Sequence, residues 1–226
     1  MNKILSTAMF LLTVLCSPVL AQDASDWLGG YYGFSLGFVD GSPEHSWAFN
    51  TVASEVDVSG FALGASYGRN YANNSMVYGF ETDINISNAD GFTIGTETPC
   101  ITTGEACNNK LNAYASLRGR VGAVMENGLL VYGTLGAAAG DIEASADTGA
   151  CGGGPGGGIP CTLDEVRLGW TAGVGFEKML ENSWNLKAEY LYMDFGDEQL
   201  DGSAFGQNVR AEFNYSVIRV GLTKRF

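Results

Sequence analysis

The fold is decided by the final segment of the chain, Ser216-Val217-Ile218-Arg219-Val220-Gly221-Leu222-Thr223-Lys224-Arg225-Phe226. Its apolar residues recur at every second position, which predicts a β-strand whose two faces meet different surroundings. The apolar file is Ile218, Val220, Leu222 and Phe226, and the opposite file is Arg219, Gly221, Thr223 and Arg225. An apolar outer face with a polar inner face is typical of a membrane barrel. We therefore expect this segment to close such a barrel, with Phe226 as the terminal residue of the closing strand.

The first residues predict a secretory signal peptide. Lys3 supplies a positive charge, residues 4–15 form an apolar run, and Val19-Leu20-Ala21 ends on the small residue that signal peptidase requires. We expect cleavage after Ala21, which makes residues 1–21 the signal peptide and residues 22–226 the barrel. The run is too short for a permanent membrane helix, so any span downstream must be a β-strand. Cys16 leaves a lipoprotein anchor open as an alternative, although it does not follow a small residue.

Seven further segments alternate in the same way, at residues 27–39, 61–68, 76–86, 111–125, 129–140, 166–178 and 184–195. The composition fits short strands rather than helices, since the chain has 32 glycines, 12% aromatic residues and only 16% charged residues. The predicted fold class is all-β, an eight-stranded antiparallel up-and-down transmembrane β-barrel.

The connections between these segments alternate strictly between short and long. Residues 73–75, 126–128 and 179–183 predict tight turns, whereas residues 40–57, 87–110, 141–165 and 196–209 predict four long loops. Outer-membrane barrels have short turns on the periplasmic side and long loops outside. We therefore expect both chain ends on the periplasmic side and four long extracellular loops.

Five short segments carry a resemblance to a known family. They are Trp27-Leu28-Gly29-Gly30-Tyr31-Tyr32-Gly33, Leu117-Arg118-Gly119-Arg120-Val121-Gly122, Gly169-Trp170-Thr171-Ala172-Gly173-Val174-Gly175, Leu186-Lys187-Ala188-Glu189-Tyr190-Leu191-Tyr192 and Arg219-Val220-Gly221-Leu222. In this order they resemble the small outer-membrane β-barrel family of immunogenic and opacity-type, porin-like proteins. The resemblance implies a surface barrel in the outer membrane of a Gram-negative bacterium, with no catalytic residues and no cofactor. Its partners would be outer-membrane lipid, lipopolysaccharide and, through the C-terminal strand, the barrel-assembly machinery.

The inward files of the predicted strands collect a nearly balanced set of charges. The acidic members are Glu81, Asp83, Glu177 and Glu189, and the basic members are Arg118, Arg120, Arg167, Lys187 and Arg219. A barrel of eight strands has room only for side chains or a narrow file of water, and an unpaired charge buried there costs several kcal/mol. We expect these residues to form ion pairs that fill the barrel. A charged gate or selectivity filter in a small channel is the alternative.

Four cysteines remain after processing, and they fall in two predicted outer loops. Local pairing, Cys100 with Cys107 and Cys151 with Cys161, is the simplest of the three possible connectivities in an oxidising compartment. A site of four thiolates for a metal ion lacks the usual spacing of two to four residues in both halves.

The net charge of −13 is concentrated in the predicted loops. The acidic residues of the third and fourth loops are Asp141, Glu143, Asp147, Asp164, Glu165, Asp194, Asp197, Glu198 and Asp201. Such a surface repels nucleic acid and attracts cations, so divalent ions could link it to lipid phosphates. Host surface molecules are the other candidate partners for the loops. Residues 197–208 only partly match a calcium-binding loop, and glycine-rich residues 152–158 lack the lysine of a phosphate-binding loop.

An outer-membrane enzyme acting on lipid remains a third class of function. The chain has one histidine, His45, which lies between Glu44 and Ser46 in the first predicted loop. Neighbours in sequence do not make a catalytic triad, so the sequence favours a non-enzyme. We expect a structural and surface-interaction protein with a side-chain-filled barrel, and a low-conductance porin-like channel is the main alternative.

Overall fold

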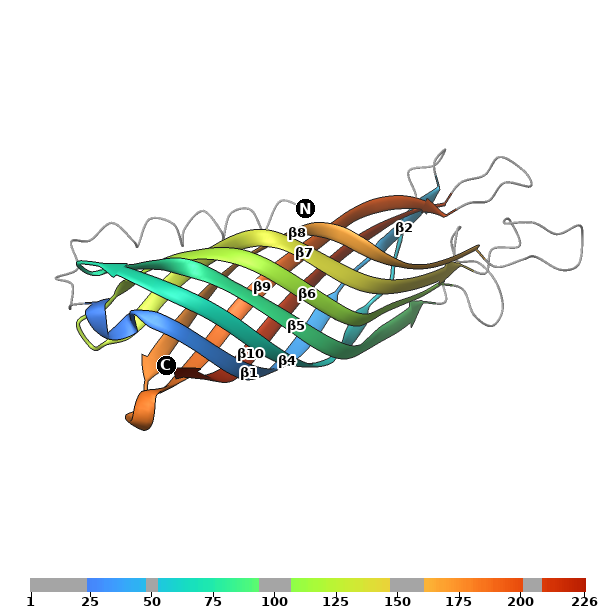
Figure 1. Cartoon of the computed structure of the whole chain (residues 1–226). Helices are drawn as coiled ribbons and strands as arrows, with labels where there is room; N and C mark the ends of the chain where they lie inside the picture. The colour runs from blue at the N-terminus through green and yellow to red at the C-terminus, as the bar shows by residue number, and fades with distance from the viewer. Residues whose placement is uncertain (1–23, 48–52, 94–106, 147–160, 201–208) are drawn as a thin grey trace, which may run out of the picture.

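The computed structural model describes residues 24–47, 53–93, 107–146, 161–200 and 209–226 (Figure 1). The predicted cleavage after Ala21 lies outside these residues, as do Cys100 and Cys151. The described chain forms one sheet that closes on itself, with its strands strongly tilted along a long cylinder.

Eight antiparallel strands make the barrel, in the order in which they occur along the chain. They are β1 (Gly29–Gly41), β4 (Val58–Asn73), β5 (Met76–Thr93), β6 (Cys107–Val124), β7 (Leu129–Ala146), β8 (Cys161–Met179), β9 (Trp184–Leu200) and β10 (Val209–Arg225). Pairing of β1 with β10, from Tyr31 opposite Arg225 to Gly41 opposite Tyr215, closes the cylinder. The predicted fold class is confirmed, including the role of β10 as the closing strand.

The alternation along each strand separates a lipid-facing surface from the interior. On β10 the side chains of Ile218, Val220 and Leu222 are exposed, whereas Arg219 between them is only 3% exposed. On β8 Leu168 is 80% exposed and Thr171 is fully buried. Exposed apolar side chains of this kind surround the barrel as a belt, which is the surface that a bilayer requires.

Tight turns join the strands at one end of the barrel, which we call the turn end. Asn74 and Asn182 have positive φ values of 54° and 58°, a conformation that asparagine tolerates better than most residues. Gly128, with φ of 70°, donates its backbone N–H to the carbonyl of Met125 at 2.9 Å. The expected turns at residues 73–75, 126–128 and 179–183 are present, the last with the short 3₁₀ helix η3 (Glu181–Ser183).

The opposite end, which we call the loop end, differs from the expectation of long irregular loops. The strands β5, β6 and β7 each have 18 residues and β8 has 19, so they run far into the predicted loops. The first predicted loop contains β2 (Glu44–Trp47) and β3 (Ala53–Glu55), and β2 pairs with β10. The sequence prediction ended each strand where its outer face stopped being apolar, but backbone pairing continues beyond that level.

The two faces exchange character toward the loop end. On β7 the outward positions change from Leu135 and Ala137 to Asp141 and Glu143, while Ile142 and Ala144 point inward and are buried. The part of the barrel nearest the loop end therefore has a polar outside and an apolar inside, as a water-soluble barrel does. Register shifts between Ile86 and Ala89, and between Leu111 and Ala113, lie close to this exchange.

Two clusters of buried apolar side chains fill the ends of the cylinder. The loop-end core consists of Val39, Val56, Val58, Ala62, Ala89, Leu111, Tyr114, Ala138, Ile142, Ala144, Leu191, Met193, Phe195, Ala211, Phe213, Tyr215 and Val217. The turn-end core consists of Ala24, Trp27, Val77, Val124, Leu130 and Tyr132. The prediction of a polar interior thus holds only for the layer between the two cores.

The turn-end core includes a segment that lies before the barrel. The short 3₁₀ helix η2 (Ala24–Trp27) folds against the turn end, where the backbone N–H of Ala24 donates to the carbonyl of Asn74 at 2.9 Å. Trp27 is 1% exposed and packs in the turn-end core. The sequence prediction placed Trp27 at the start of the first strand and did not foresee that it packs into the turn-end core. Among the described residues, no helix is long and apolar enough to cross a membrane.

Glycines facing inward provide the room for the large interior side chains. A Cβ atom on Gly68 would lie 2.4 Å from the ring of Tyr31, and a Cβ on Gly175 would lie 2.5 Å from the hydroxyl of Tyr132. By contrast, a Cβ on the outward-facing Gly133 would find its nearest neighbour at 3.9 Å.

The substitution Gly68→Ala is therefore expected to destabilise the barrel, because it forces the Tyr31 ring to move. Overpacking of this kind costs about 1–3 kcal/mol in free energy of unfolding. Gly133→Ala is the matched control and should change it by less than about 0.5 kcal/mol. Urea unfolding of the two variants in lipid vesicles measures the difference, and equal stabilities would contradict the assigned interior packing.

Candidate functional site

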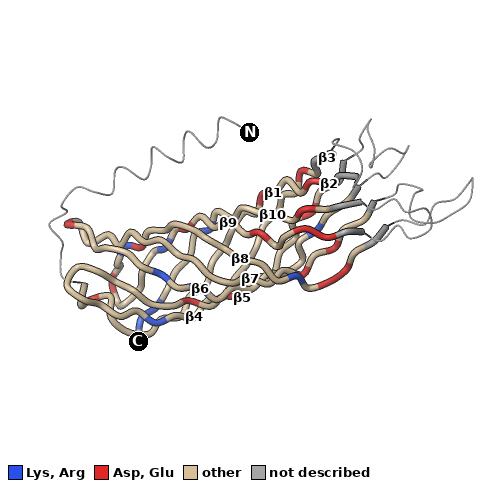
Figure 2. The backbone as a smooth tube through the Cα atoms, turned by 90° about the horizontal axis from the view of Figure 1, so that it is seen from above, with Lys and Arg blue, Asp and Glu red and all other residues tan. Residues whose placement is uncertain are grey.

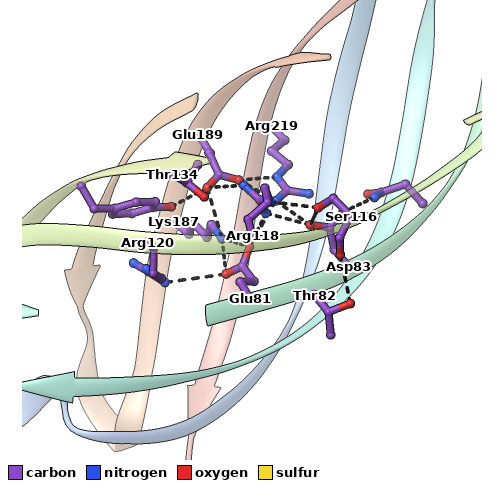
Figure 3. Close-up of polar contacts among 12 residues, drawn as sticks. Glu81, Thr82, Asp83, Ser116, Arg118, Arg120, Thr134, Lys187, Glu189 and Arg219 are labelled. Carbon is purple, nitrogen blue, oxygen red and sulfur yellow. Dashed lines mark hydrogen bonds and ion pairs between the residues drawn. The ribbon is translucent and has the colours of Figure 1, made fainter. Parts of the chain in front are cut away.

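The predicted interior charges meet in one layer between the two apolar cores (Figure 3). Eight of the nine predicted residues belong to this charged layer: Glu81 and Asp83 of β5, Arg118 and Arg120 of β6, Glu177 of β8, Lys187 and Glu189 of β9, and Arg219 of β10. None of them is more than 5% exposed. The layer lies at the level of the apolar belt, since Arg219 points inward between the outward Ile218 and Val220.

Arg118 contacts three carboxylates at once. Its Nη2 lies 2.6 Å from Oε1 of Glu81 and 2.7 Å from Oδ2 of Asp83, and its Nη1 lies 3.1 Å from Oε1 of Glu189. Its Nε donates to Oγ of Ser116 at 2.9 Å, and the same hydroxyl donates to Asp83. The fork of the guanidinium suits such multiple contacts, which a single ammonium group could not make in the same way.

Glu81 is the anion with the most partners. Nζ of Lys187 lies 2.6 Å from each of its carboxylate oxygens, and the hydroxyl of Tyr31 donates to Oε2 at 2.7 Å. Nη2 of Arg219 lies 3.3 Å from Oε1. With Arg118, these contacts connect β1, β5, β6, β9 and β10 through one side chain.

Arg219 joins the closing strand to its neighbour. Its Nη2 lies 2.5 Å from Oε2 of Glu189 on β9 and 3.3 Å from Oδ2 of Asp83 on β5. The hydroxyl of Tyr132 on β7 donates to the other oxygen of Glu189 at 2.9 Å. The charged layer therefore crosses the barrel instead of following one strand pair.

Arg120 and Glu177 form the part of the layer nearest the turn end. Nη2 of Arg120 lies 2.8 Å from Oε1 of Glu177, and Nη1 donates to the hydroxyl of Tyr31 at 2.7 Å. The guanidinium carbon lies 3.9 Å from the centre of the Tyr132 ring, within the range of a cation–π contact. Tyr132 also belongs to the turn-end core, so the charged and apolar parts are in direct contact.

The prediction was wrong in including Arg167 in this set. Arg167 lies on β8 ten residues before Glu177, which is about 33 Å along an extended strand. It pairs at the loop end with Glu165 at 2.7 Å and Glu198 at 2.9 Å, and its guanidinium lies over the ring of Phe213. Alternation gives the face of the barrel on which a side chain lies, but not its height along the axis.

The tyrosines Tyr31 and Tyr132 are the functional members that sequence reasoning missed. Both stand in the inward files of their strands, so their orientation could be predicted. Their hydroxyls complete the contacts of Glu81 and Glu189, which a list restricted to charged residues does not reveal. An inward aromatic residue opposite an inward glycine, such as Tyr31 and Gly68, is the pattern that could have indicated them.

The layer is electrically balanced and tightly filled. It contains four carboxylates and four cations, and each carboxylate lies within 2.8 Å of a basic nitrogen. A cavity lined in part by Lys187 and Arg219 has a volume of about 10 Å³, room for no more than one water molecule. Removing one member of such a set leaves an uncompensated buried charge, which is strongly destabilising.

The other candidate sites are only partly described. Within the described ranges, no group of three or more histidine, cysteine, aspartate or glutamate residues could hold a metal ion. His45 and Ser46 lie in β2. Residues 152–158 lie outside the described residues, as do residues 201–208 of the calcium-loop candidate.

The acidic residues of the predicted loops lie mainly on strands. They gather toward the loop end, away from the C-terminus (Figure 2). We call this group the acidic rim; its described members are Asp40, Glu44, Asp57, Asp90, Asp141, Glu143, Asp164, Glu165, Asp194, Asp197, Glu198 and Glu212.

Comparison with known proteins agrees with this architecture. Residues 8–226 match the family described as outer membrane protein beta-barrel domain. The chain belongs to this family. It is 30% identical over 241 residues to the 31 kDa outer-membrane immunogenic protein of Brucella melitensis, an alignment that covers 97% of this chain and 96% of that protein. The predicted family and the predicted location, the outer membrane of a Gram-negative bacterium, are confirmed.

One further relative and one solved structure are similar to this outer-membrane barrel. It is 28% identical over 211 residues to the 22 kDa outer membrane protein of Rhizobium leguminosarum, covering 91% of this chain and 81% of that one. The crystal structure of OprG from Pseudomonas aeruginosa matches with a TM-score of 0.56 at 15% identity, over 92% of this chain and 99% of that chain. The likeness to OprG shows the shared fold.

The substitution Arg118→Met tests the energetic role of the charged layer. It leaves Glu81, Asp83 and Glu189 with fewer cations in a buried setting, and loss of one partner of a buried pair costs about 3–5 kcal/mol. The expected result is a fall of that size in the free energy of unfolding, measured by urea titration in lipid vesicles.

Lys110→Met is the matched control for that substitution. The side chain of Lys110 is 42% exposed and lies 4.0 Å from Glu143, so its loss should change the free energy of unfolding by less than about 1 kcal/mol. Similar effects for the two variants would show that the layer does not stabilise the barrel.

Proposed function

We propose that the protein is a closed structural barrel that presents its loop end at the cell surface, without a conducting pore or an enzymatic activity. The observation that carries this proposal is the filled interior. A balanced charged layer occupies the middle, and an apolar core closes it on each side. Water and ions would have to cross buried apolar side chains at both ends, which a conducting pathway cannot tolerate.

The loop-end part of the barrel, outside the apolar belt, supports a surface-interaction role. In this part the strands have an apolar interior and a polar exterior, so they can hold the loops rigidly in water. Relatives from Brucella are named outer-membrane immunogenic proteins, a name that is consistent with exposure at the cell surface. We assign the same exposure to the loop end of this chain, and the turn end to the periplasm.

The acidic rim gives the loop end its chemistry. Its carboxylates would lie beside the phosphate groups of lipopolysaccharide, so divalent cations are the partners that could bridge the two negative surfaces. Host surface molecules of basic character are the complementary protein partners. At the other end, Phe226 follows the C-terminal strand β10 and lies beside Tyr32 and Tyr67. We assign this end of the chain to recognition by the barrel-assembly machinery.

The strand register bears on the cysteine pairing. The backbone positions of Cys107 on β6 and Cys161 on β8 both align with Ala146 of the intervening β7. Two strand spacings place them about 10 Å apart, beyond the roughly 7 Å that a disulfide can bridge. This geometry disfavours a bond between Cys107 and Cys161, which removes one of the three possible connectivities. Of the two that remain, we propose the local pairs Cys100–Cys107 and Cys151–Cys161. Peptide mapping without reduction identifies the pairs.

The N-terminal fold supports the proposed signal cleavage. Ala24 is fully buried against the turn end and Trp27 fills the mouth, so a mature chain beginning at residue 22 would need only two residues before this contact. The intact mass of the purified protein identifies the cleavage site.

Conductance across a planar lipid bilayer separates the closed barrel from the porin-like alternative. The wild-type protein is expected to give no steady ion steps, because both mouths are closed. Steps that appear in the wild type and in Lys110→Met, but are lost or altered in Arg118→Met and Glu81→Gln, would establish a pore through the charged layer and refute the proposal.

Cysteine labelling on intact cells tests the orientation. A membrane-impermeant maleimide should modify Asp164→Cys at the loop end and leave Glu126→Cys at the turn end unmodified until the outer membrane is broken. The wild-type protein gives the background from its own cysteines. Labelling of Glu126→Cys alone on intact cells would invert the assignment.

A further inference from the structure

The lipid-facing surface is not uniformly convex. An open groove of about 990 Å³ crosses β4 to β9 within the apolar belt. Its floor contains the outward positions Gly119 and Gly133, which have no side chain, and Ala172, which has only a methyl group. Its walls include Leu135 and Val174. We call this feature the lateral groove. It goes beyond the proposed function, which concerns only the interior and the loop end.

The lateral groove follows one row of paired residues around the barrel. In register order the row is Tyr71, Tyr78, Val121, Gly133, Val174 and Tyr190. Six strands at about 4.8 Å spacing give it a length of about 24 Å. The row is perpendicular to strands that tilt by about 40°, so it rises about 15 Å along the barrel axis, which is half of a hydrocarbon core of about 30 Å. The groove therefore has the extent of one leaflet.

The groove begins at the turn end and rises toward the middle of the membrane. Tyr71 and Tyr78 stand next to the turn at residues 73–75, with their rings stacked at 5.7 Å. Tyr190, at the other end, lies six residues from the start of β9 and is bound through its hydroxyl to Ser216 at 2.9 Å. Paired tyrosines at the membrane boundary are typical of the level at which headgroups lie.

A second feature at the same end points to the headgroup itself. Arg69 occupies an outward position of β4 between Tyr67 and Tyr71, in a file that is otherwise largely apolar. Its guanidinium lies 5.7 Å from the centre of the Tyr71 ring, so it leans toward the turn end. Within the described part of the chain, Arg69 forms no ion pair with a carboxylate. A guanidinium at this depth is suited to bind a lipid phosphate.

We propose that the lateral groove is a binding site for one phospholipid of the periplasmic leaflet. One acyl chain lies along the floor from Tyr78 toward Tyr190, and the phosphate is bound by Arg69. Two observations favour a phospholipid over a second copy of the protein. The groove has the length of one leaflet, and Arg69 lies at the end of the groove nearest the membrane surface. A second copy of the protein could cover the apolar groove, but it would leave Arg69 without a binding partner in the site.

Two substitutions remove the two halves of the site separately. Gly133→Leu fills the floor, and the barrel can accept it because a Cβ there meets no atom closer than 3.9 Å. Arg69→Gln removes the phosphate ligand. The matched controls are Ala65→Leu, on the lipid face outside the groove, and Lys224→Gln, a cation beside Trp184 elsewhere on the same boundary.

Native mass spectrometry of the purified mature protein, titrated with palmitoyl-oleoyl phosphatidylethanolamine in detergent, measures the binding. The wild type and both controls are expected to hold one phospholipid. Gly133→Leu should weaken binding by at least about tenfold, because several CH₂ groups of the acyl chain would no longer be buried in the groove. Arg69→Gln should weaken it by about threefold to tenfold.

Palmitoyl-oleoyl glycerol, which lacks the phosphate, separates the two contributions. Its binding should respond to Gly133→Leu and not to Arg69→Gln. Gly119→Leu provides a second filling variant, and unchanged heat-modifiable migration on gels shows that each variant is folded. Equal phospholipid binding by all variants would overturn the proposal. So would a lipid-free dimer that dissociates in Gly133→Leu, because it would assign the groove to a second copy.

Discussion

The structure depends on the mutual neutralisation of charges buried inside a membrane-embedded cylinder. Neither lipid outside nor water inside is available to solvate Glu81, Arg118 or Arg219, so each must find its counter-charge on another strand. The partners come from β5, β6, β8, β9 and β10, with tyrosine hydroxyls from β1 and β7. A slip of one residue in any of these strands would turn its charges toward lipid, so the layer also fixes the register of the sheet.

The layer can exist because the barrel changes character along its axis. Within the membrane the outside is apolar and the inside polar, while toward the loop end the outside becomes polar and the inside apolar. The loop-end core and the turn-end core flank the charges on both sides. This arrangement supports the proposed role as a closed support for surface loops.

Much of this architecture could be predicted from the alternation of residues. The eight barrel strands, the inward orientation of Arg118 and Glu189, and the tight turns follow from period two and from Asn and Gly at the turns. Arg167 shows the limit, because parity gives the face but not the level at which a tilted strand places a side chain. The continuation of β7 past Asp141 was missed because the outer face alone was used to end strands. The role of Trp27 and the lateral groove depend on contacts between segments that are far apart in sequence.

The most direct test of the account is a double-mutant cycle on Arg120 and Glu177, whose carboxylate has Arg120 as its closest basic partner at 2.8 Å. The free energy of unfolding is measured in lipid vesicles for Arg120→Met, Glu177→Leu and the double variant. If buried charges of the layer neutralise one another, the double variant should lose less stability than the sum of the single losses, by about 1–3 kcal/mol. Strict additivity of the two losses would contradict the account.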